Sequence, residues 1–118
     1  MKQNNAKHRR EDSWRSMKIL AIEHDLLDAS GDQFTEPLLK AEARRAWELH
    51  QTGVIRELYF RADQHAAVLV LECADVEEAR SALATLPLVW ARLIEFELIP
   101  LTAYPGFARL FVSPLTPE

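Results

Sequence analysis

The chain has 118 residues, of which 48% are hydrophobic and 27% are charged, and this balance is typical of one folded domain with a modest core. The formal net charge is −4, but residues 1–16 hold five basic and two acidic residues, so the remainder carries −7, which argues against a nucleic-acid-binding surface. The single cysteine excludes an internal disulfide, and no apolar run reaches the ~18 residues of a membrane span, so we expect a cytoplasmic protein without membrane contact.

Residues 1–16 form a polar leader without a hydrophobic pattern, and Trp14 is its only apolar anchor. We expect a disordered N-terminal extension here, with a basic tail that binds an acidic partner as the alternative. The regular pattern begins at Met17, so residues 17–118 are predicted to form a single domain.

The first strand and the first helix follow this leader. Residues 17–24, "MKILAIEH", are apolar and alternate in the manner of a β-strand. Thr35 is a predicted N-cap, and apolar side chains then recur at helical spacing as far as Gln51. Gly53 is a natural stop for this helix.

A hairpin and a second helix come next. The hairpin consists of predicted strands over residues 54–61 and 65–73, joined through "ADQH". Asp75 and the glutamate three residues later resemble a capping box, which predicts a helix that Pro87 breaks. Residues 91–101 are predicted to form the last strand.

The predicted order of elements is β-α-β-β-α-β. Right-handed crossovers fold this order into a ferredoxin-like α+β domain, with a four-stranded antiparallel sheet and both helices on one face. The other face must be solvated or covered by a second copy. The tail over residues 104–112, "YPGFARLFV", is too apolar to remain in water, so we expect it to dock onto a partner subunit or onto a sheet edge.

The hairpin determines which side chains share the uncovered face. A turn at Asp63–Gln64 pairs Tyr59 with Val68, Glu57 with Val70 and Ile55 with Glu72. We expect an apolar patch on the uncovered face, and therefore a protein that is not a monomer, from the following residues: Ile19, Ala21, Ile55, Val68, Val70, Leu93 and Ile99. The acidic residues expected to converge there are Glu23, Glu72 and either Glu95 or Glu97, together with Tyr59 and Arg61.

The stretch from Leu49 to Gly106 carries a family resemblance. It contains a helix that ends in glycine, an arginine early in the next strand (Arg56), an acidic helix start, "LPL" at residues 86–88, and "PL" then "P" at residues 100, 101 and 105. With these features, the chain resembles the muconolactone isomerase family over roughly residues 38–105. Tyr104 stands where the pattern PL-x-x-H-P has a histidine.

The resemblance implies a dimeric α+β barrel, in which two sheets pack open face to open face around a pocket, with further assembly into a larger oligomer. It also implies a cofactor-free reaction that moves a proton between two carbons of an unsaturated lactone bearing a carboxylate. Such a reaction needs a base whose pKa is raised by burial and donors that hold the enolate oxygen.

Glu72 is the predicted base because the rest of its strand is apolar, and Arg61 and Tyr59 are the predicted donors. The alternative is that Glu72 forms a structural ion pair with an arginine across the dimer interface. The predicted ligand-binding residues are Glu23, His24, Arg56, Glu97 and Tyr104. For His24, a solvated strand end is the alternative to an acid–base couple with a neighbouring aspartate.

No metal or cofactor is expected. The four histidines lack a metal-ligand spacing, and the chain has no phosphate-binding glycine loop. We therefore expect a cytoplasmic homodimer or higher homo-oligomer that isomerises a small lactone or organic acid. The alternatives are a non-catalytic barrel that binds a small ligand and a purely structural oligomer.

Overall fold

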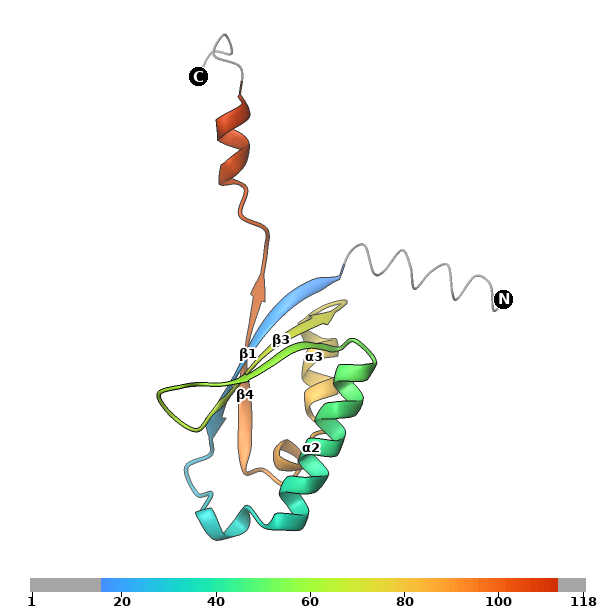
Figure 1. The fold of residues 1–118 in the computed structure, drawn as a ribbon, viewed down its shortest axis with the longest axis vertical. Helices are drawn as coiled ribbons and strands as arrows, with labels where there is room; N and C mark the ends of the chain where they lie inside the picture. The colour runs from blue at the N-terminus through green and yellow to red at the C-terminus, as the bar shows by residue number, and fades with distance from the viewer. Residues whose placement is uncertain (1–15, 113–118) are drawn as a thin grey trace, which may run out of the picture.

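The computed structural model describes residues 16–112, so almost all of the predicted N-terminal extension lies outside the described residues. Figure 1 shows a twisted sheet with helices packed on one side of it. The elements are β1 (Met17–Asp25), η1 (Gly31–Gln33), α2 (Glu36–Gln51), β2 (Ile55–Phe60), β3 (Ala67–Cys73), α3 (Val76–Leu83), α4 (Pro87–Trp90), β4 (Ile94–Leu101) and η2 (Gly106–Phe111).

The four strands form one antiparallel sheet in the order β2-β3-β1-β4. In Figure 1, α2 and α3 lie on the same face of this sheet. This arrangement confirms the α+β class and the ferredoxin-like topology predicted from the sequence.

Helices α2 and α3 begin where the sequence supplies a capping side chain. Thr35 Oγ1 accepts a hydrogen bond from the backbone N–H of Leu38 at 3.4 Å at the start of α2. Asp75 accepts from the N–H of Glu78 at 2.8 Å, and the Glu78 carboxylate accepts from the N–H of Ala74 at 2.5 Å, which completes a capping arrangement at α3.

The stretch after Pro87 differs from the prediction. Pro87 does not simply end the second helix, because it occupies the first turn of a separate short helix, α4. Arg92 then adopts a φ of 63°, which reverses the chain, so β4 begins at Ile94 rather than at residue 91.

The core lies between the sheet and the helices. Its central side chains are almost fully buried: Ile19, Ala21, Ile55, Leu69, Leu71, Ala79 and Leu83. The pairing of β1 with β3 sets Ile19 beside Leu71 and Ala21 beside Leu69, and residues paired in this way share a face.

The predicted composition of the uncovered face was therefore partly wrong. Ile19 and Ala21 lie under the helices, and so does Ile55, because an irregularity between Ile55 and Glu57 shifts its partner from Glu72 to Leu71. Leu93 is buried outside the sheet in a cluster with Leu88. The half-buried apolar residues that do share the uncovered face are Leu20, Ile22, Val68, Val70 and Ile99.

Beyond β4 the chain leaves the domain. Residues 102–112, called the C-terminal arm below, project away from the sheet in Figure 1 and carry η2 at their far end. Phe107 and Phe111 are 67% and 83% exposed. The Tyr104 and Phe107 rings pack edge to face at 5.0 Å over Gly106, where a Cβ would collide with the Tyr104 ring. Docking of this arm stays a prediction.

Candidate functional site

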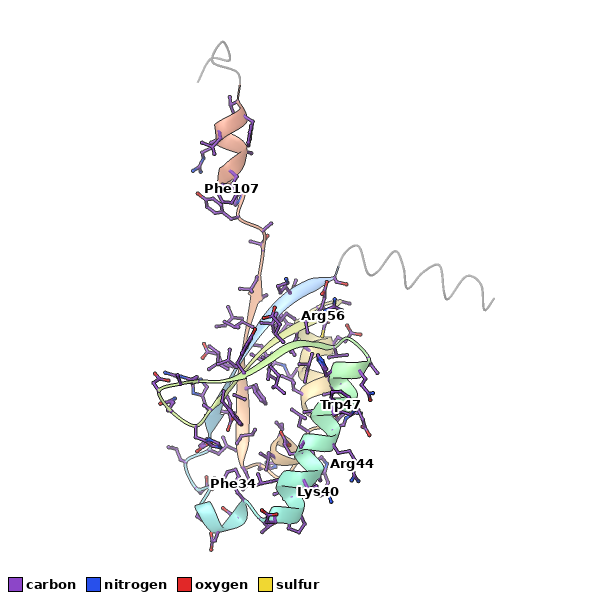
Figure 2. All side chains as sticks on the ribbon, in the orientation of Figure 1. Phe34, Lys40, Arg44, Trp47, Arg56 and Phe107 are labelled. Atoms are coloured by element: carbon purple, nitrogen blue, oxygen red, sulfur yellow. The ribbon has the colours of Figure 1, made fainter. Side chains whose placement is uncertain are left out.

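A pocket of about 890 Å³ opens between α2 and the helix-facing side of the sheet. All four strands and α2 contribute to its wall, and most of the side chains in it are apolar. These apolar residues include Phe34, Leu39, Ile55, Leu58, Phe60, Leu69, Leu86, Leu88, Ile94 and Phe96. Figure 2 shows Phe34 near the turn that precedes α2, at one end of this space.

Glu23 enters the pocket from β1 and is only 9% exposed. The β1–β3 pairing ends at Ile22 and Val68, and beyond it the Glu23 carboxylate accepts a hydrogen bond from the backbone N–H of Ala67 at 2.7 Å. Burial raises the pKa of Glu23 above its ordinary value, although the Ala67 hydrogen bond opposes this rise. The nearby charge of Asp25 raises this pKa further.

Glu42 enters the same pocket from α2. Its Oε1 accepts a hydrogen bond from the N–H of Leu88 at 2.8 Å, in the first turn of α4. Leu86, the N-cap of that helix, has no side chain that can cap it, so Glu42 satisfies an amide that the helix leaves free. Burial raises the pKa of Glu42, the Leu88 hydrogen bond lowers it, and the charge of Glu23 raises it again.

Three further polar residues border the pocket: Asp25 at the end of β1, His65, and Tyr59 in β2, whose side chain shares the uncovered face with Val68. The His65 ring lies against Phe60 at 4.7 Å, and its charge lowers the pKa of Glu23. The Tyr59 hydroxyl donates to the Glu57 carboxylate at 2.6 Å, and this bond raises the pKa of Tyr59. The pocket therefore joins two desolvated carboxylates to a wall that is otherwise mostly apolar.

The structure places Glu72, the predicted base, on the uncovered face of the sheet, where it was expected, and therefore away from this pocket. Its Oε1 lies 3.5 Å from Arg56 Nε, and both side chains are partly exposed. The expected neighbours of Glu72 were therefore wrong: Arg61 binds Asp63 at 2.7 Å beside the turn, and Tyr59 binds Glu57. The irregularity in β2 at Ile55–Glu57 is what brings Arg56 to Glu72.

Most of the other predicted site residues lie outside this pocket. Among the predicted ligand-binding residues, only Glu23 reaches the pocket, and it does so on the helix side rather than on the uncovered face. His24 Nε2 and Glu97 Oε1 are hydrogen bonded at 3.0 Å on the uncovered face. Tyr104 lies in the C-terminal arm.

Sequence reasoning missed Glu42. The signal was present, because Glu42 lies four residues after Leu38 and seven before Leu49, on the stripe that α2 turns toward the core. An acidic residue on an otherwise apolar stripe is costly unless it is bonded or used.

Within residues 16–112 no cluster of three or more His, Cys, Asp or Glu side chains is arranged to hold a metal ion. None of the helices in the same range is long and apolar enough to cross a membrane.

The fold and the site together define a ferredoxin-like α+β protein with a mostly apolar pocket that contains two glutamates desolvated by burial. The family model described as muconolactone delta-isomerase matches residues 19–106, from β1 to the beginning of η2. The chain therefore belongs to the muconolactone delta-isomerase family. No curated protein matches it significantly.

Proposed function

We propose that this protein is a cofactor-free isomerase that moves a proton between two carbons of an unsaturated lactone in the pocket between α2 and the sheet. The observation that carries the proposal is the pair of desolvated carboxylates, Glu23 and Glu42, in one apolar pocket. A carboxylate whose pKa is raised toward neutrality can both take and return a proton at working pH.

The surroundings of the two carboxylates favour different roles. The Ala67 N–H and the charge of His65 stabilise ionised Glu23 against burial and the charge of Asp25, and we assign Glu23 as the base. The charge of Glu23 raises the pKa of Glu42, which favours Glu42 as the protonated partner.

The proton transfers then form a closed cycle within the pocket. Ionised Glu23 takes a proton from the carbon next to the carbonyl, and the C–H electron pair moves into a dienolate. Protonated Glu42 supplies a proton to the far carbon as the double bond shifts, and a proton exchange between the two carboxyl groups restores the starting state. The apolar wall excludes water, which strengthens these electrostatic interactions.

The direct test is turnover of a β,γ-unsaturated butenolide in D₂O, followed by proton NMR. The protein should accelerate both the double-bond shift and the deuterium uptake above the buffer rate. Glu23→Gln and Glu42→Gln should each lower kcat by about 10²–10⁴-fold. Glu77→Gln is the matched control, since the Glu77 side chain is 82% exposed on α3. Wild-type turnover equal to that of both pocket variants would refute the proposal.

A non-catalytic ligand-binding protein is the second candidate function, and one observation favours it. Both pocket carboxylates accept backbone hydrogen bonds, so each already has a structural role at the end of an element. Ligand binding without any deuterium exchange, in the wild type and in both variants, would favour this candidate.

We also propose a homodimer or higher homo-oligomer built on the uncovered face. The apolar row Leu20, Ile22, Val68, Val70 and Ile99 supports this assembly, because a contiguous apolar patch on a sheet favours contact with a second copy. Light scattering at micromolar concentration should return a multiple of 13.5 kDa. A monomer mass would refute the assembly without touching the pocket chemistry.

A further inference from the structure

Most of the ionisable side chains that line the pocket are acidic, which is unusual. Glu23, Asp25 and Glu42 line it, His65 is the one side chain in the wall that can become a cation, and within the described residues no arginine or lysine belongs to the lining. A pocket that binds carboxylates normally presents a guanidinium or ammonium group to them.

The nearby basic residues are committed elsewhere. Arg45 Nη1 lies 2.9 Å from Glu48, and its Nε donates to Thr85. Arg61 is held by Asp63 at 2.7 Å. Lys40 and Arg44 are exposed on α2, and Figure 2 shows Arg44 on the side of that helix away from the sheet.

An anionic ligand would therefore meet an excess of like charge, because His65, the only basic side chain that the described part of the chain places in the wall, already offsets part of the charge of Glu23. The wall around the two glutamates is apolar, so the repulsion is weakly screened compared with a surface site. The charge of Glu23 already raises the pKa of Glu42, which shows that like charges act on each other across this wall. A neutral ligand has no such cost.

A cationic ligand is disfavoured for a different reason. Most of the wall is hydrocarbon, and a cation would lose its water there. Each glutamate already accepts a backbone N–H bond, which occupies part of its acceptor capacity.

The volume of the pocket also indicates the size of its ligand. At about 890 Å³ the pocket is close to the upper end of the roughly 300–1,000 Å³ that accommodate drug-sized ligands. A single five-membered lactone would leave much of the apolar wall uncovered.

We propose that the ligand of this pocket is an uncharged carbonyl compound with a large apolar body, such as a lactone or enone on an aryl or fused-ring skeleton, and that carboxylate-bearing compounds are excluded. The carbonyl rests on the proposed function, whereas the neutral charge and the apolar body rest on the pocket wall alone.

The experiment compares three probes of one shape: 2-naphthylacetamide, 2-naphthylacetate and 2-naphthylethylamine. At neutral pH the amide is neutral, the acetate is anionic and the amine is cationic, so the three probes differ mainly in charge on one skeleton. Binding is followed by NMR through the backbone amide signals of Ala67 and Leu88, which donate to the two pocket carboxylates.

The amide should bind at least about tenfold more tightly than the acetate at neutral pH, as expected for like charges at partial screening. Glu23→Gln, which removes the ionised carboxylate, should narrow this ratio by improving acetate binding, and Glu77→Gln should leave the ratio unchanged. Acetate or amine binding as tight as that of the amide, or no binding of any probe, would overturn the inference.

These outcomes are separable from the catalytic proposal. Selective binding of the neutral probe without turnover of a matching neutral butenolide supports the ligand class and refutes the isomerase. Turnover of a carboxylate-bearing lactone that exceeds turnover of its amide supports the isomerase and overturns the ligand class.

Discussion

Two substitutions of Glu42 distinguish the contribution of its hydrogen bond to stability from the contribution of its charge. Glu42→Ala removes the acceptor for the Leu88 N–H, which it meets at 2.8 Å, and leaves an amide of the α4 first turn without a partner. An unsatisfied buried amide costs about 1–3 kcal/mol. For a domain of this size, each kcal/mol lowers Tm by roughly 4–8 °C. Glu42→Gln keeps an acceptor oxygen at the same place and removes only the charge.

The two variants should therefore differ in their pH dependence. The pKa of folded Glu42 lies above its ordinary value of 4.5, so the folded protein holds this proton more tightly than the unfolded chain does. The resulting stabilisation of the wild type is full below pH 4.5 and is lost as the pH rises through the folded pKa. Glutamine has no such proton, so the Tm of Glu42→Gln relative to the wild type should rise across this window and then level off.

Thermal unfolding followed by circular dichroism from about pH 4 to about pH 8 measures this difference. Glu77→Gln, at an exposed position on α3, controls for the change in net charge. A Tm difference between Glu42→Gln and the wild type that stays constant over this range would show that Glu42 is not desolvated, and the acid–base reasoning would fail with it. A Glu42→Ala variant as stable as Glu42→Gln would refute the role of the Leu88 hydrogen bond.

Three further predictions concern other parts of the chain. Truncation after Thr102 should lower Tm or the oligomer mass in light scattering, because each docked aromatic contributes about 1.5–3 kcal/mol; an unchanged mass and Tm would show that the C-terminal arm does not dock. Glu72→Gln should retain turnover, because Glu72 is half of a partly exposed ion pair with Arg56; a large loss of kcat would return the role of base to Glu72. Gly53→Ala should cost about 1–2 kcal/mol in urea unfolding, because Gly53 has a φ of 89°, and full stability would contradict this.

The helix starts and the hairpin were predictable because their signals are local. Thr35 and Asp75 cap their helices within three residues, and the hairpin turn fixes the pairing of Tyr59 with Val68 and of Glu57 with Val70. Each of these interactions depends on short stretches of chain.

The face of β1 was not predictable in the same way. Both alternating sets in this strand are apolar, since Ile19 and Ala21 alternate with Leu20 and Ile22. Which set lies under the helices is decided by the pairing with β3, fifty or so residues away. The irregularity in β2 carried no signal either, because no glycine marks it.

The candidate site could be predicted only in part from the sequence, because the contacts that hold its two glutamates join distant parts of the chain. Glu23 and Glu42 are 19 positions apart in the printed sequence, and each is held by an amide further along the chain: Ala67, 44 residues after Glu23, and Leu88, 46 residues after Glu42. Both amides are free because a regular element begins there, β3 for Ala67 and α4 for Leu88. The ends of the elements therefore position the carboxylates, while the core around them raises their pKa values. A substitution that keeps the acceptor oxygen can thus test the chemistry of either glutamate without removing the contact that orients it.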